Sequence, residues 1–105
     1  MADYLPDVYT DFRSQFPSIA TALDALAREV DATGPLDARV TRLVKLGMAV
    51  ASQSQGAVRS NVRKALDAGA DRSEIENVIL LALTTSGLPT VIAAWQWAQD
   101  ALTGD

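Results

Sequence analysis

The sequence predicts an all-α protein of about six helices. Apolar residues recur at spacings of three and four along much of the chain, which is the period of an amphipathic helix. Proline and glycine interrupt this pattern where one helix would end and the next begin, and the composition is rich in alanine, a strong helix former. A chain of 105 residues is expected to form one domain with a single modest core.

Two helices are expected before residue 36. Pro6 can open the first, and Pro17 suits the first turn of the second. The first helix carries Val8, Tyr9 and Phe12 on its apolar side. The second has one apolar stripe, formed by Ile19, Leu23, Leu26 and Val30 at spacings of four, three and four. Gly34 and Pro35 end it.

The middle of the chain predicts a third and a fourth helix. Asp37 is a good N-cap for the third, which is expected to reach about Ser54. Its buried stripe is predicted to be Val40, Leu43, Val44, Gly47 and Ala51, with Gly47 marking close backbone packing. The fourth helix is expected to carry Val58, Val62, Ala65 and Leu66 inward and to end near Ala68 and Gly69.

Two overlapping capping boxes, Asp71 with Glu74 and Ser73 with Glu76, predict the start of a fifth helix. Residues 78–83 of that helix read VILLAL, which is apolar on every side. Gly87 ends it, and Pro89 begins a sixth helix that reaches Leu102. Because a helix that is apolar all round must be buried all round, we expect one face to pack against another subunit.

Composition excludes several kinds of chemistry. The chain has no histidine and no cysteine, so thiol nucleophiles, imidazole catalysis and His/Cys metal sites are ruled out. Its carboxylates lack metal-ligand grouping, and no metal or cofactor is expected. A net charge of −4 and the absence of a long apolar run argue against nucleic-acid and membrane partners. The acidic N-terminal residues and the lack of cysteine favour a cytoplasmic location.

One long run of the sequence carries a family pattern. Leu36 and Asp37 precede a long helix, and residues 62–94 read VRKALDAGADRSEIENVILLALTTSGLPTVIAA. In this spacing of glycines, capping residues and apolar positions, the stretch from Leu36 to Leu102 resembles the carboxymuconolactone decarboxylase / alkylhydroperoxidase AhpD family. The resemblance implies one AhpD-like domain over residues 1–105, with 1–35 as an N-terminal helical extension and 36–105 as the core.

The resemblance also implies where catalytic residues would stand. Redox members carry Cys-x-x-Cys at the start of the fourth helix, a histidine four residues later, and an acid on the preceding helix. The matching positions here are Ser54, Ala57, Asn61 and Arg42. Serine forms no disulfide, asparagine carries no proton and arginine is permanently cationic. Thiol peroxidase activity is therefore excluded, and no catalytic residue is assigned.

Basic residues gather around these positions. Six of them and no acid lie between Ala38 and Leu66: Arg39, Arg42, Lys45, Arg59, Arg63 and Lys64. Together Arg42, Ser54, Gln55, Arg59 and Asn61 could form a cradle for a small anionic or carboxylate ligand near the N-terminus of the fourth helix. The simpler alternative is a site that has lost its role, in which Arg42 reaches solvent or pairs with Glu74 or Asp71.

Three functions stay open, and whether the chain is an enzyme is one of the open points. The first is a non-redox homo-oligomer, a trimer or hexamer, that binds a small acid. The second is a lactone-decarboxylase-type enzyme that uses groups other than histidine. The third is a structural or interaction subunit retained for its helical assembly alone.

Overall fold

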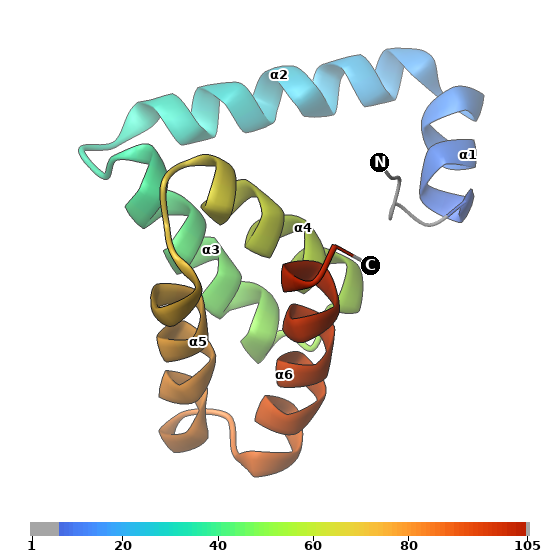
Figure 1. Ribbon diagram of the computed structural model, residues 1–105. Coiled ribbons are helices and arrows are strands. Elements are labelled where there is room, and N and C mark those ends of the chain that lie inside the picture. Colours follow the sequence, from blue (N-terminus) through green and yellow to red (C-terminus); the bar gives the residue numbers. More distant parts are fainter. Residues whose placement is uncertain (1–6, 105) are drawn as a thin grey trace. The chain divides into compact units, whose positions relative to one another are not determined.

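A computed structural model describes residues 7–104 (Figure 1). Over these residues the protein is all-α, with no strand, which confirms the predicted fold class. The helices are α1 (Asp7–Gln15), α2 (Pro17–Thr33), α3 (Ala38–Ala51), α4 (Gln55–Asp67), α5 (Arg72–Leu81) and α6 (Leu88–Leu102), with a 3₁₀ turn η1 (Ala82–Thr84) after α5. Pro6, expected to open the first helix, lies outside the described residues.

The chain divides into two compact units, Met1–Leu36 and Asp37–Asp105. In the N-terminal unit, Arg13 of α1 donates two hydrogen bonds to Asp24 of α2, at 3.1 and 2.6 Å. These bonds lower the pKa of the Asp24 carboxyl below its usual value. Of the described residues in this unit, Ala20 alone is buried. The described part of the N-terminal unit therefore has almost no buried core of its own.

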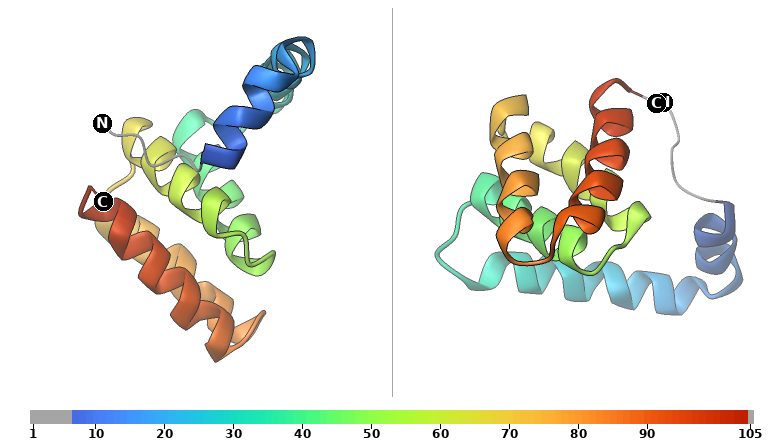
Figure 2. Two further views of the ribbon diagram at one scale, coloured as in Figure 1. Left: turned by 90° about the vertical axis from the view of Figure 1, so that its right-hand side faces the viewer. Right: turned by 90° about the horizontal axis from the view of Figure 1, so that it is seen from below.

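The second unit, which we call the core unit, has a continuous apolar interior. α3 packs against α4 and α5, and α6 packs against the same two helices, so that the four surround one core (Figures 1 and 2). Every helix of the unit contributes to it, and its fully buried large side chains are Leu46, Val50, Val58, Val62, Ile75 and Ile79. Burial of about six such side chains contributes on the order of 10 kcal/mol of hydrophobic free energy.

The predicted capping residues begin the helices of the core unit. The Asp37 carboxylate accepts from the Val40 backbone N–H at 2.9 Å. The Asp71 carboxylate accepts from the Glu74 N–H at 2.9 Å, while the Glu74 side chain accepts from the Asp71 N–H at 3.1 Å. Of the two capping boxes, only the one formed by Asp71 and Glu74 begins α5, because the Ser73 hydroxyl donates to Asp71 instead.

Two helices end earlier than the sequence predicted. α3 stops at Ala51 rather than Ser54, because Gln53 adopts a left-handed φ of 57° and Ser54 becomes the N-cap of α4. The fifth helix stops at Leu81 and tightens into η1. There the N–H groups of Ser86 and Gly87 both donate to the Ala82 carbonyl, and Gly87 takes a φ of 95°.

The predicted buried face of α3 is wrong. The chain buries Leu46, Ala49 and Val50, whereas the predicted stripe stays half-buried or exposed, with Val44 at 43% exposure. A Cβ added at Gly47 would lie 3.6 Å from Val78 Cγ1, an ordinary contact, so close packing does not require glycine there. Leu66, also expected inside, is 38% exposed. α3 has two apolar faces, and the apolar pattern alone could not show which one the chain covers.

Candidate functional site

Ser54, the position that the resemblance matched to the first cysteine of redox members, lies directly before α4. Ser54 is the N-cap of this helix, and its Oγ accepts from the Ala57 backbone N–H at 3.4 Å, a long hydrogen bond. Gln55, the first residue of the helix, is exposed. At this end of α4, therefore, the serine hydroxyl serves the helix terminus.

The side-chain amide of Asn61 uses its donor group in a hydrogen bond, but its acceptor oxygen has no partner in the described part of the chain. Its Nδ2 donates to the Ala57 carbonyl at 3.0 Å, while its buried Oδ1 has no hydrogen-bond partner among the described residues. Turning the amide over would set Oδ1 against the Ala57 carbonyl oxygen, so the observed orientation is the favourable one. A buried acceptor without a donor costs about 1–3 kcal/mol. Asn61 thus presents an acceptor that a donor group would stabilise.

Arg42 and Asn61 lie on the two helices joined by the α3–α4 connection. α3 and α4 run in opposite directions and are joined by residues 52–54 (Figure 1). At 1.5 Å of rise per residue, Arg42 is about 13 Å and Asn61 about 9 Å from this connection. Arg42 is half-buried and stands one turn before buried Leu46, on the core side of α3. Because α3 and α4 pack against each other, the two residues lie on adjoining helices at heights that differ by less than one turn.

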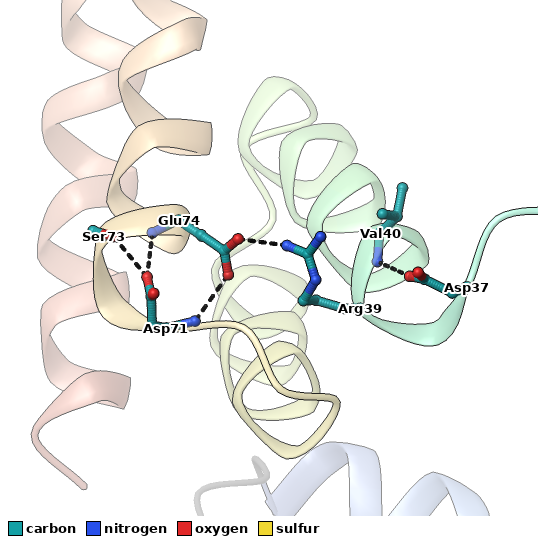
Figure 3. Close-up of polar contacts among 6 residues, drawn as sticks. All are labelled: Asp37, Arg39, Val40, Asp71, Ser73 and Glu74. Carbon is teal, nitrogen blue, oxygen red and sulfur yellow. Dashed lines mark hydrogen bonds and ion pairs between the residues drawn. The ribbon is translucent and has the colours of Figure 1, made fainter.

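The two acids named as possible partners of Arg42 take part in other contacts. Glu74 accepts a hydrogen bond from Arg39, and it also completes the capping box at the start of α5 (Figure 3). Asp71 caps α5, and the Ser73 hydroxyl and the Glu74 N–H lower the pKa of its carboxyl below the usual value. Arg39 and Glu74 thus tie the first turns of α3 and α5 together.

Arg59 contacts another helix, α6. Its guanidinium donates to Asp100 of α6 at 2.9 Å, and Gln96 donates to the same carboxylate at 2.9 Å. Because Arg59 is two residues from Asn61, the two side chains point about 160° apart around α4. The five candidates are therefore not gathered in one cradle. Ser54 and Gln55 lie at the start of α4, Asn61 lies further along α4, Arg42 lies on α3, and Arg59 pairs with Asp100 of α6.

An open apolar groove of about 310 Å³ lies between α3, α5 and η1. The sequence did not predict it. We call it the α3–α5 groove. It is lined by Val40, Leu43, Val44, Gly47, Val78, Leu81, Ala82 and Thr85. Thr85 supplies the one polar side chain among these, and its hydroxyl donates to the Ala82 carbonyl at 3.5 Å. In the sequence, the only indication of this groove is the apolar stripe of α3 that was expected to be buried in the core.

Comparison with known proteins establishes the family. The chain belongs to the carboxymuconolactone decarboxylase family, whose model matches residues 17–100. The match begins at the first residue of α2 and so includes that helix, whereas the resemblance seen in the sequence began at Leu36.

Two similar proteins have lengths close to that of this chain. An uncharacterized protein of Methanocaldococcus jannaschii, MJ1511, is 27% identical over 95 residues, which are 90% of this chain and 89% of that protein. The crystal structure of apo-lpg0406, a carboxymuconolactone decarboxylase family protein from Legionella pneumophila, matches with a TM-score of 0.79 and 24% identity. That match covers 92% of this chain and 89% of the other. At this identity the second likeness supports the fold.

Two further observations bear on the class of site. Among residues 7–104, no group of three or more carboxylates is arranged to hold a metal ion. None of the helices in the same range is long and apolar enough to cross a membrane.

Proposed function

We propose that this family member is a non-redox protein that binds a small carboxylic acid in the seam between α3 and α4. Arg42 supplies a cation for the carboxylate, and Asn61 Oδ1 accepts a hydrogen bond from a hydroxyl or amino group of the same ligand. The buried, unpartnered Oδ1 of Asn61 is the observation that carries this proposal. A cytoplasmic location, which fits a chain without cysteine, is part of it.

The expected class of ligand follows from the chemical groups of Arg42 and Asn61. Neither is a thiol or an imidazole, so the seam has no group for disulfide exchange or for proton transfer near neutral pH. Arg42 favours a negative charge, whereas Asn61 Oδ1 favours a donor. A simple anion would bind Arg42 only. A hydroxy acid or an amino acid would bind both residues, so we propose this narrower class within the anionic ligands expected from the sequence.

A thermal-shift comparison of matched acids tests the proposal. Each small hydroxy acid is compared with the same acid lacking the hydroxyl. Both are added to the wild type and to the variants Asn61→Leu and Arg42→Gln. Gln55→Ala, at the first residue of α4, is the control. We expect a hydroxy acid at a hundred times its Kd to stabilise the wild type and Gln55→Ala by about 3 kcal/mol. Asn61→Leu should lose the preference for the hydroxyl, about fivefold in Kd, and Arg42→Gln should lose binding of both acids.

The same screen can contradict the proposal. If no acid raises the melting temperature, or if Arg42→Gln and Asn61→Leu respond to every hit as the wild type does, the seam is not a ligand site. In that case the second candidate, a structural or interaction subunit, would be preferred. The large apolar surface that the single chain leaves exposed favours that candidate, including Met48 at 64% and Leu81 at 61% exposure.

A further inference from the structure

α2 carries an apolar stripe that its own unit does not bury. Ile19, Leu23, Leu26 and Val30 are 49%, 50%, 59% and 54% exposed, although they form one continuous face of a 17-residue helix. The N-terminal unit ends at Leu36, and units of fewer than about 40 residues usually need a disulfide, a metal or association with another chain. The chain has no cysteine, and among residues 7–104 no carboxylates are grouped to hold a metal ion, so the stripe must be covered by another protein surface, in the same chain or in a second copy.

The α3–α5 groove has the length and the character to receive such a stripe. Along α3 it extends from Val40 to Gly47, seven residues or about 10 Å of helix. On α2, Leu23 and Val30 are also seven residues apart, with Leu26 between them. A helix laid into an apolar groove contacts it through residues at this kind of spacing. Ligand pockets usually add several converging polar groups. Because the groove offers only the Thr85 hydroxyl, it suits a row of apolar side chains better than a polar small molecule.

The charges of the two helices are complementary. α2 contains three acids and one base, Asp24, Glu29, Asp31 and Arg28, which gives −2. α3, one wall of the groove, contains three bases and no acid, Arg39, Arg42 and Lys45, which gives +3. Opposite net charges orient an encounter and disfavour pairing of two like helices. The basic residues of α3 could therefore attract the acidic α2 helix as well as bind an anionic ligand.

We propose that α2 of one copy of this chain docks into the α3–α5 groove of a second copy. Each chain carries one stripe that its N-terminal unit leaves exposed and one open groove in its core unit. Exchange of an identical element between protomers is a low-cost route to an oligomer. The family model spans residues 17–100, so the helix and the groove both belong to the matched domain, which favours a second copy over an unrelated partner. This assembly can be tested separately from the acid binding proposed above, because it does not involve Asn61 and uses Arg42 only for its contribution to the net charge of α3.

The absence of cysteine makes a direct test possible. Leu26→Cys and Val44→Cys are made in separate proteins of different mass, mixed at micromolar concentration and oxidised gently. Thr21→Cys with Val44→Cys is the matched control. Thr21 is exposed and two residues from Leu23, about 160° around the helix from the stripe. Docked thiols meet at an effective concentration in the millimolar range, so we expect the mixed disulfide of the first pair to form roughly a hundredfold faster than that of the control.

A chain that carries both Leu26→Cys and Val44→Cys separates exchange between copies from folding back within one chain. The proposal expects covalent dimers and larger species from dilute protein. It is overturned if the disulfide forms only within single chains, or if the mixed pair reacts no faster than the control. Leu23→Cys, one turn earlier on the same stripe, replaces Leu26→Cys if that variant does not fold. None of these results depends on whether an acid binds at Arg42 and Asn61.

Discussion

The two units of this chain use similar helices in different ways. In the core unit the amphipathic helices cover one another, and side chains such as Leu46 and Ile79 are fully buried. In the N-terminal unit α2 has an equally regular apolar stripe, yet its large side chains stay about half exposed. This contrast shows that hydrophobic periodicity predicts a helix and its apolar face. It does not tell which surface covers that face, or whether that surface belongs to the same chain.

The largest effect expected from this difference is on stability. Leu46→Ala should lower the free energy of unfolding of the core unit by about 3 kcal/mol, because it removes a fully buried side chain and leaves a cavity. Leu23→Ala, on the half-exposed stripe, should change the same quantity by about 0.5 kcal/mol or less in dilute protein. Urea denaturation followed by circular dichroism measures both. Equal losses in dilute protein would show that α2 is covered within one chain.

A smaller effect is expected at the start of α5, in the core unit. The pKa of Asp71 is lowered by hydrogen bonds from the Ser73 hydroxyl and the Glu74 N–H. A carboxyl whose pKa is lower in the folded state stabilises the fold above its unfolded pKa of about 4, and that stabilisation is lost as pH falls through the folded pKa. Asp71→Asn keeps an N-cap but does not titrate.

The measurement is the melting temperature from pH 7 to pH 2. At pH 7, Asp71→Asn should melt slightly below the wild type, because it keeps an N-cap but lacks the stabilising charge, while Asp71→Ala should melt about 5 °C below the wild type because the cap is lost. Below about pH 4 the wild type should lose melting temperature more steeply than Asp71→Asn. Parallel curves for these two proteins would mean that the Asp71 carboxylate contributes nothing to the stability of the core unit.

The smallest effect is expected at Gly47, on the face of α3 that lines the α3–α5 groove. Alanine has a higher helix propensity than glycine, and the added Cβ would make an ordinary contact with Val78. Gly47→Ala should therefore stabilise the single chain by about 0.5–1 kcal/mol. It should also weaken association, because the methyl group enters the α3–α5 groove. A loss of stability in dilute protein would show that α3 and α5 pack more closely than in this structure.

Much of the fold could be predicted, because it depends on local signals. The order of the helices followed from periodicity and from Pro17, Gly34 and Gly87, and Asp37 and Asp71 act as the N-caps that the sequence indicated. The end of α3 was misplaced because nothing in the residue type requires the left-handed conformation of Gln53. The choice between the two apolar faces of α3 depends on tertiary packing, which single-sequence patterns do not contain.

The candidate site could be located only as a set of positions. The family resemblance placed Ser54 and Asn61 on α4, but it could not show that a buried acceptor of Asn61 is left without a donor. Nor could it show that Arg59 pairs with Asp100, 41 positions along the chain. Such pairings are set when helices distant in sequence come together. The structure therefore moved the emphasis from a single cradle of five residues to Arg42 and Asn61.

We expect a second copy of the chain to cover the apolar stripe of α2. Sedimentation velocity at several concentrations tests it most directly, with the wild type, Leu26→Glu and the exposed control Thr21→Glu. We predict an oligomer, a trimer or hexamer, for the wild type and Thr21→Glu. Leu26→Glu should sediment as a smaller species that keeps the helical signal of the core unit, since a charge would be buried in the interface. A wild type that stays monomeric at all concentrations, or a Leu26→Glu variant that sediments as the wild type does, would contradict the claim.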